Sequence, residues 1–151
     1  MDHAPILLCY DGTADADRAI ESAAALFGPG RAVVLDIGPP LTTAESLTLV
    51  SSVVPGAAYE ELNTAGALEH ARSGAERAEK AGFTAESRGE LAAPVWEGIV
   101  NVADEIDAAV IVLGSRGLSG AREAFIGSVS HQVAEHSTRP VLIVPPHDDH
   151  P

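Results

Sequence analysis

The stretch AAVIVLGSRGLSGAREAFIGSVSHQV, residues 108–133, decides the fold class of this chain. Residues 108–114 form the strongest candidate for a buried strand, and a helical pattern follows at 128–136. Four glycines lie at positions 114 to 127, between the strand and the helix. A strand, a glycine-rich loop and a helix in this order are typical of α/β proteins, which bind ligands at the carboxyl ends of their parallel strands.

The rest of the chain alternates short apolar runs with longer segments of helical period. Strands are predicted at 6–10, 32–37, 83–91, 108–114 and 140–146, and helices at 14–27, 57–81, 94–106 and 128–136. The strand at 83–91 has a weak, alternating pattern that is typical of a position near the edge of a sheet. Residues 41–56 are poorly patterned and are predicted as a loop, with or without a short helix. The order predicts an α/β fold with a single open, parallel, five-stranded sheet and helices on both faces.

Three details of the helices follow from the pattern. In the first helix, Thr13 is the expected N-cap, and the apolar stripe consists of Ala19, Ile20, Ala23, Leu26 and Phe27. In the segment 57–81, Gly66 and Gly74 each cost about 1 kcal/mol relative to alanine. Trp96 is interpreted as core packing.

Length and charge limit the function classes. The chain has 151 residues, 22 Asp and Glu, 9 Lys and Arg and a formal net charge of −13. We expect one domain, residues 1–146, and a disordered tail at 147–151, whose His and Asp residues are read as solvated. Scattered basic residues argue against a nucleic-acid or membrane partner. The chain has no apparent signal peptide or membrane span, and its one cysteine, Cys9, fits a buried apolar position, so a cytoplasmic protein is expected.

The glycines are explained by a phosphate ligand. A loop can wrap a phosphate only if its backbone N–H groups point inward and no side chain blocks the approach. Gly114 and Gly117 would shape the turn, and Gly127 and Ser128 would supply free N–H groups and a hydroxyl at the helix start. The P-loop, the dinucleotide fingerprint GxGxxG after a strand and the GxSxG elbow are all absent. His131 is read as a polar helix position.

The spacing Gly114-x-x-Gly117, nine residues, then Gly127-Ser128 resembles the G-2x-G-9x-G-(S/T) motif of the universal stress protein family, in its ATP-binding branch. The likeness extends to ILLCYDGT at 6–13, VVLDIGPP at 33–40 and the closing helix and strand. It implies the sheet order 3-2-1-4-5. It also implies that ATP, with or without Mg²⁺, lies across the ends of strands 1 and 4.

The resemblance places Asp11 at the adenosine end and Ile37 against adenine. It places Gly114, Arg116 and Gly117 at the ribose and phosphate turn, and Gly127, Ser128 and Ser130 at the phosphates. The implied nucleotide-binding residues are Asp11, Gly12, Thr13, Ile37, Leu113, Gly114, Arg116, Gly117, Gly127, Ser128, Val129 and Ser130. Two positions depart from the family pattern: Asp36 stands where a histidine is frequent, and Gly38 adjoins the implied base pocket. No catalytic residue and no metal ligand is assigned.

The expected function is a nucleotide-dependent regulatory or sensor module in the stress response. The alternatives are a dimeric stress protein that acts through partner binding without nucleotide, and a slow ATPase. A glycine-rich loop with one arginine lacks the groups that position water for rapid hydrolysis, so at most weak turnover is expected. The family likeness further implies a homodimer through the apolar edge strand, at Val141, Leu142, Ile143 and Val144. The sequence does not identify the protein partner.

Overall fold

The computed structural model of the protein describes residues 3–40, 56–115 and 127–146. Most of the predicted loop at 41–56, the site residues Arg116 and Gly117, and the predicted tail at 147–151 lie outside these ranges. In the described part of the chain, no helix is both long and apolar enough to cross a membrane.

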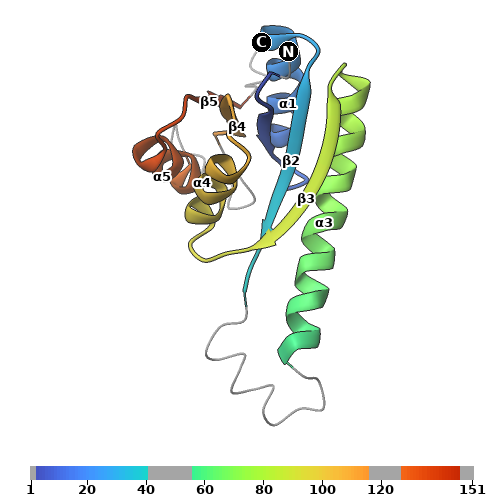
Figure 1. Ribbon diagram of the computed structural model, residues 1–151, viewed down its shortest axis with the longest axis vertical. Helices are drawn as coiled ribbons and strands as arrows, with labels where there is room; N and C mark the ends of the chain where they lie inside the picture. The colour runs from blue at the N-terminus through green and yellow to red at the C-terminus, as the bar shows by residue number, and fades with distance from the viewer. Residues whose placement is uncertain (1–2, 41–55, 116–126, 147–151) are drawn as a thin grey trace.

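Five parallel strands form one sheet in the order β3-β2-β1-β4-β5 (Figure 1). They are β1 (Ile6–Cys9), β2 (Arg31–Gly38), β3 (Thr84–Leu91), β4 (Val110–Gly114) and β5 (Val141–Val144). The predicted fold class and strand order are confirmed, and so is the edge position of the weakly patterned strand. Strand order reverses at β1, from which the chain proceeds first to β2 and later to β4.

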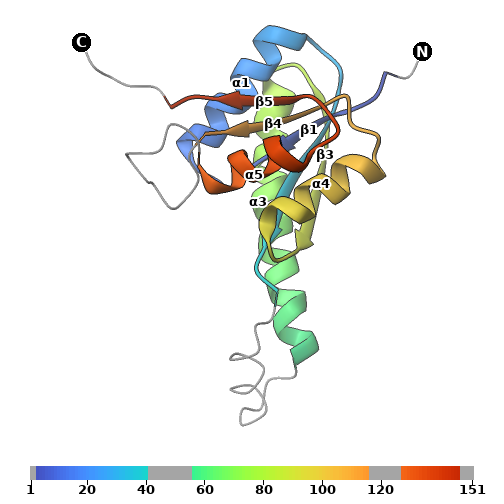
Figure 2. The same cartoon turned by 90° about the vertical axis from the view of Figure 1, so that its left-hand side faces the viewer.

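Helices cover both faces of the sheet. The described helices are α1 (Ala14–Phe27), α3 (Gly56–Lys80), α4 (Val95–Glu105) and α5 (Ser128–His136). In Figures 1 and 2, α1 and α3 lie on one face, and α4 and α5 lie on the other. Parallel strands buried on both faces require this arrangement, which explains why their sequences are continuously apolar rather than alternating.

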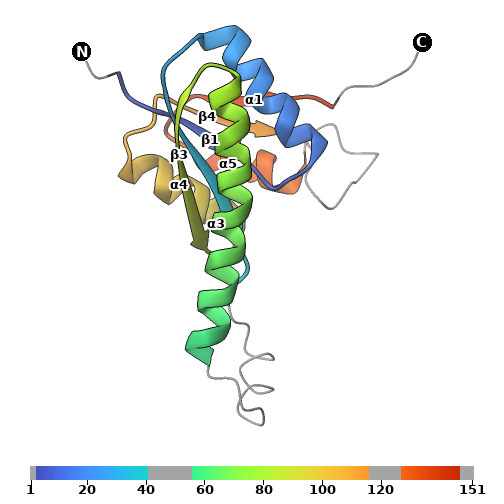
Figure 3. The same cartoon turned by 90° about the vertical axis from the view of Figure 1, so that its right-hand side faces the viewer.

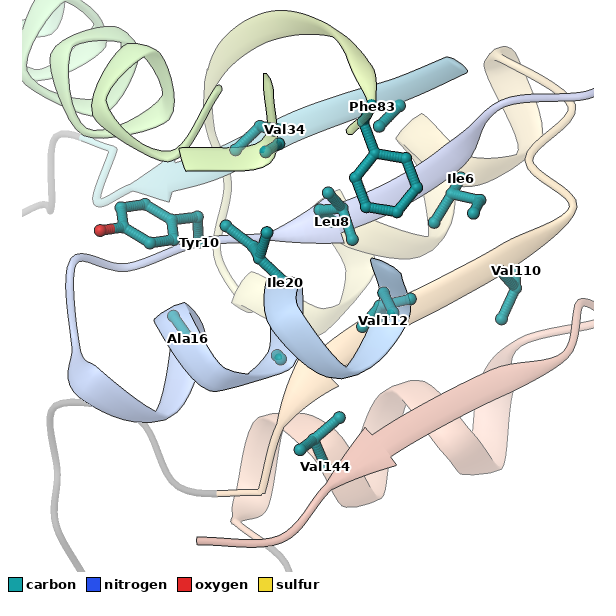
Figure 4. Packing of buried hydrophobic residues seen from close by; sticks show 14 residues of the cluster. Ile6, Leu8, Tyr10, Ala16, Ile20, Val34, Phe83, Val110, Val112 and Val144 are labelled. Carbon is teal, nitrogen blue, oxygen red and sulfur yellow. The ribbon is translucent and has the colours of Figure 1, made fainter. Parts of the chain in front are cut away.

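Each face of the sheet has its own apolar core. Leu8 and Val34 point toward α1 and α3 and belong to one cluster with Ile20 of α1 and with Phe83, which follows α3 (Figure 4). Their strand neighbour Leu7 points the other way and packs with residues of α4 and α5. The alternation of side chains along a strand therefore divides each apolar run between two cores.

The structure corrects the predicted apolar stripe of α1. Ala19, Ile20 and Ala23 are buried, but the side chains of Leu26 and Phe27 are 64% and 46% exposed. They lie in the last turn of α1, immediately before Gly28, whose positive φ of 71° turns the chain away. Helical spacing alone does not show where the covering sheet ends.

The bounds of the helices and strands agree closely with the sequence analysis, and so does the packing role of Trp96. β1 ends at Cys9 rather than residue 10, although the Tyr10 N–H still donates to the Leu35 carbonyl at 2.8 Å. Pro94 precedes the first helical residue of α4 as its N-cap. Trp96 packs against the core under α4 and stacks on the His136 ring of α5, with ring centroids 4.1 Å apart. Its interpretation as a packing residue is confirmed.

Candidate functional site

A cavity of about 630 Å³ opens where the strand order reverses. β1 stops at Cys9, opposite Leu35, whereas β2 continues for three residues to Gly38. The space beyond β1 is bounded by β2, α3, α4, the end of β4 and the start of α5. Open parallel sheets bind ligands at such a switch point, and the volume is in the range of small-molecule sites.

The cavity gathers most of the predicted site residues. Nine of the twelve line it: Asp11, Thr13, Ile37, Leu113, Gly114, Gly127, Ser128, Val129 and Ser130. Gly12 belongs to the turn after β1 but is not among the lining residues. Arg116 and Gly117 fall in the range 116–126, outside the described residues.

The turn after β1 is held by its own side chains. The Asp11 carboxylate accepts hydrogen bonds from the Thr13 backbone N–H at 3.1 Å and from its hydroxyl at 2.5 Å. Thr13 Oγ1 in turn accepts from the Ala16 N–H and caps α1, as predicted. Gly12 has φ +82°, which glycine adopts without strain. The sequence DGT is thus a rigid turn that fixes Asp11 at the cavity wall.

The end of β4 is packed closely against α1. A Cβ on Gly114 would lie 3.2 Å from backbone and side-chain atoms of Asp15, so glycine at this position allows α1 to approach. The Gly114 carbonyl accepts a hydrogen bond from the Ser130 hydroxyl at 2.8 Å. This glycine therefore has a packing role, in addition to any role in a phosphate turn.

The start of α5 differs in part from the prediction. The Gly127 N–H is not free, because it donates to the Ser115 carbonyl. Ser130 is buried, and its hydroxyl donates a hydrogen bond to the Gly114 carbonyl. Other groups at this helix start remain accessible. The N-cap residue of α5 is Gly127, so no side chain caps the helix, and Ser128 and Val129 are exposed in its first turn. The N–H groups of that first turn give the helix N-terminus its affinity for anions.

The β2 side of the cavity is formed by Asp36 and Ile37. Backbone groups of alternate residues point to the same neighbouring strand, so the N–H and C=O of Ile37 face the same side as those of Leu35. β1 has already ended there, which leaves this stretch of β2 facing the cavity. The Asp36 side chain is only 13% exposed, and its Oδ2 lies 2.8 Å from Nδ1 of His70 on α3.

Burial raises the pKa of Asp36, and the nearby charge of Asp11 adds to this effect. The hydrogen bonds from His70 and from the Ile37 backbone N–H oppose it, because they favour the ionised carboxylate. Asp11 and Asp36 are the carboxylates of the lining, and the described lining residues include no Lys or Arg. In the described ranges, no three potential metal ligands come together.

Sequence reasoning missed the contribution of α3. Leu62, Asn63, Gly66, Ala67 and His70 all line the cavity. The helix was predicted, but its position over the end of β2 depends on the tertiary structure. The signal available in the sequence is the spacing of Gly66 and His70, four residues apart on one helix face.

The family model for universal stress proteins matches residues 3–145. The chain belongs to this family. Universal stress protein Rv1636 of Mycobacterium tuberculosis is 30% identical over 140 residues, which cover 92% of this chain and 94% of that protein. Universal stress protein YxiE of Bacillus subtilis is 47% identical over 77 residues, about half of each chain: 51% of this one and 49% of YxiE.

Solved structures of similar proteins agree with the universal stress protein fold. Hypothetical protein MJ0577 superposes with a TM-score of 0.78 at 21% identity, covering 99% of this chain and all of that one. A universal stress protein in complex with cAMP has a TM-score of 0.62 at 25% identity, covering 96% and 98%. The Archaeoglobus fulgidus protein in complex with dAMP has a TM-score of 0.61 at 21% identity, covering 95% and 99%.

Proposed function

We propose that this universal stress protein binds an adenine nucleotide, ATP first among them, and acts as a nucleotide-dependent regulatory module in the stress response. The observation that carries the proposal is the cavity at the switch point, into which the start of α5 opens. Its size suits a nucleotide, and a helix N-terminus favours phosphate. The cAMP and dAMP complexes of the similar proteins support the same ligand class.

The two walls suggest how the nucleotide lies. Phosphates fit the first turn of α5, at Ser128 and Val129, because free N–H groups and the helix dipole favour anions there. The base then reaches across the apolar interior toward Ile37 on β2, whose backbone faces the cavity. Asp11 lies between these ends. Neither Lys nor Arg is present among the described lining residues, so a bound Mg²⁺ would assist a triphosphate.

The experiment separates the backbone N–H of Ser128 from its hydroxyl. Proline is favoured at the first helical position, and Gly127 already has the extended conformation, φ −64° and ψ 159°, that precedes proline. Ser128→Pro therefore removes an N–H while α5 persists. We expect ATP affinity by calorimetry to fall about tenfold or more, because a hydrogen bond to a charged group contributes about 1.5–3 kcal/mol.

Ser128→Ala is the matched control, since it removes the hydroxyl and keeps the N–H. We expect it to lose less affinity than Ser128→Pro, and thermal unfolding should show that both variants are folded. If Ser128→Pro bound ATP as tightly as the wild type, the proposal that the phosphates bind at the start of α5 would be wrong.

Turnover is proposed to be slow or nil. The described lining residues contain no cation that would neutralise charge on a transferring phosphoryl group. Excess protein mixed with Mg²⁺ and labelled ATP should therefore leave the nucleotide intact over many seconds. Conversion to ADP within seconds would favour the ATPase alternative.

A homodimer through β5 is a second part of the proposal. β5 is an edge strand, and its residues Val141, Leu142 and Ile143 are only partly buried within one chain. Apolar edges invite pairing. Light scattering at micromolar concentration should give twice the chain mass, and Ile143→Lys should shift it toward the monomer. A monomeric wild-type protein would overturn this part and leave nucleotide binding untouched.

A further inference from the structure

Strand β3 has a free edge. It is eight residues long, Thr84–Leu91, and in the described part of the chain it pairs with β2 alone (Figure 1). None of its residues is buried, whereas most residues of the neighbouring β2 are. An unpaired strand of this length presents a row of backbone donors and acceptors, to which another extended segment can add.

The backbone groups at the free edge belong to the odd-numbered residues. The Thr84 N–H donates to the Gly30 carbonyl at 2.8 Å, and the Ala92 N–H donates to the Gly38 carbonyl at 3.3 Å, so both point toward β2. Backbone groups of alternate residues point to the same neighbouring strand, so the even-numbered residues between these two also face β2. The residues whose N–H and C=O groups face outward are therefore Ala85, Ser87, Gly89 and Leu91.

The side chains of β3 lie above and below this edge. The odd-numbered residues face α3, which packs so closely that a Cβ on Gly89 would lie 2.5 Å from the Leu68 backbone nitrogen. The even-numbered residues lie on the α4 side of the sheet, because Glu86 pairs in register with Val33, a member of the core on that side. A segment that approaches in the plane of the sheet therefore meets backbone groups.

The charges beside the edge indicate which segment fits. The Arg88 guanidinium already bonds to Glu90 and to Glu105 of α4, each at 2.7 Å. Glu86, two residues before Arg88 on the same side of the sheet, is exposed. Its carboxylate, Glu90 and Glu105 outnumber the one guanidinium, so the α4 side of this edge is acidic. Side chains on an added strand lie beside these groups at every second position, where a cation is favoured and a carboxylate is repelled.

We propose that the free edge of β3 binds an extended, basic segment of another protein as an additional strand, with Lys or Arg at alternate positions beside Glu86 and Glu90. Main-chain hydrogen bonds hold the segment, and the alternate cations select it. A second copy of this chain fits less well, because it brings the same acidic edge and a net charge of −13. β3 and β5 are opposite edges of the sheet, so this binding is independent of the proposed homodimer.

The test uses the full chain and the synthetic peptide Lys-Val-Lys-Thr-Lys-Val-Lys-Thr. Amide hydrogen exchange followed by NMR should slow by about two- to tenfold at the outward-facing N–H groups of β3, since a bound strand gives such groups hydrogen-bond partners. The N–H groups of Glu86 and Arg88 face β2 and should change less. A control peptide of the same composition with its four lysines contiguous measures the general attraction of a basic peptide to an acidic protein.

Ser87→Pro removes one outward-facing N–H. Proline is tolerated in an edge strand where its missing N–H faces solvent, so the sheet should persist, and thermal unfolding checks this. We expect the affinity for the alternating peptide to fall at least about fivefold, because a hydrogen bond is lost and the ring obstructs the approach. Ser87→Ala keeps the N–H and is the matched control, with wild-type affinity.

Glu86→Lys tests the charge selection. It replaces an attraction by a repulsion at an exposed cross-strand position, so we expect the affinity for the alternating peptide to fall about two- to fivefold. If Ser87→Pro does not fold, this variant and the exchange pattern of the wild type decide the matter.

Three results would overturn the proposal. The first is no binding of the alternating peptide, or equal binding of the contiguous-lysine peptide. The second is a bound peptide that leaves exchange at the outward-facing N–H groups unchanged, because the peptide would then lie elsewhere on the acidic surface. The third is exchange at these groups that slows with rising concentration of the free protein, because a second copy would then occupy the edge.

Discussion

The two halves of α3 use the same residue type for opposite purposes. In the half that packs on the sheet, Gly74 is buried, and a Cβ there would lie 2.6 Å from the Tyr10 ring and 2.8 Å from Val34. In the N-terminal half, whose first turns extend past the sheet in Figure 3, the helix still packs on the ends of β2 and β3 at Ala67 and Leu68. Gly66 is nevertheless exposed, and a Cβ there would meet nothing within 4 Å. His70 lies midway between them along the helix and is exposed. One glycine permits close packing, and the other leaves a cavity open.

Among these variants, Gly74→Ala is expected to change stability the most. Alanine gains helix propensity of about 1 kcal/mol, but its methyl group overlaps the Tyr10 ring and Val34, which belong to the core. Overpacking of this kind typically costs 1–3 kcal/mol. We expect a net loss of up to about 2 kcal/mol in the free energy of unfolding, measured by urea titration. A stabilised variant would show that α3 is free to move away from the sheet.

Gly66→Ala should have the opposite sign. The methyl group has open space, so only the helix propensity changes, and we expect a gain of about 0.5–1 kcal/mol in the same titration. Together the two variants form a matched pair, with one substitution in one helix. If both variants moved stability in the same direction, the two halves of α3 would not differ as described.

The smallest expected effect concerns Asp36, which pairs with His70 of α3. Because burial raises its pKa, the folded state binds more protons than the unfolded state just above the ordinary carboxyl pKa of about 3.9. Wild-type stability therefore loses a contribution as the pH rises through the mildly acidic range above about 4. Asp36→Asn lacks this loss, so its stability relative to the wild type should improve across that window.

Unfolding titrations at several pH values measure the difference, and Glu76→Gln, which changes an exposed carboxylate of α3, serves as the control. A relative stability of Asp36→Asn that declines with rising pH would mean that His70 outweighs burial at this carboxylate.

The sequence predicted the sheet well because four of its five strands lie in continuous apolar runs between clear breaks, and β3, the exception, has an alternating pattern. It also located the residues at the ends of β1 and β4, since DGT and the spaced glycines are local patterns. It did not show that α3 lines the cavity, and it did not distinguish Gly66 from Gly74. Both depend on which strands and side chains pack against α3. Leu26 and Phe27 were wrongly included in the α1 stripe for the same reason.

Hydrogen bonding at the site also lay beyond the pattern. Gly127 and Ser130 were expected to offer polar hydrogens to a phosphate, but the Gly127 N–H donates to the Ser115 carbonyl and the Ser130 hydroxyl to the Gly114 carbonyl. A motif identifies which residues come together. The partners that they choose depend on the backbone path around them.

The central claim is that the cavity at the switch point of the sheet, beside the N-terminal half of α3, holds an adenine nucleotide. Native mass spectrometry of the freshly purified protein, and of the same protein incubated with excess ATP, tests it most directly. We predict a species heavier than the 15.5 kDa chain, or its multiple, by one adenine nucleotide per chain. At equal ATP concentration Ser128→Pro should show less of this species than the wild type, whereas Ser128→Ala should retain more of it. Wild-type protein that carries no nucleotide in either sample would contradict the claim.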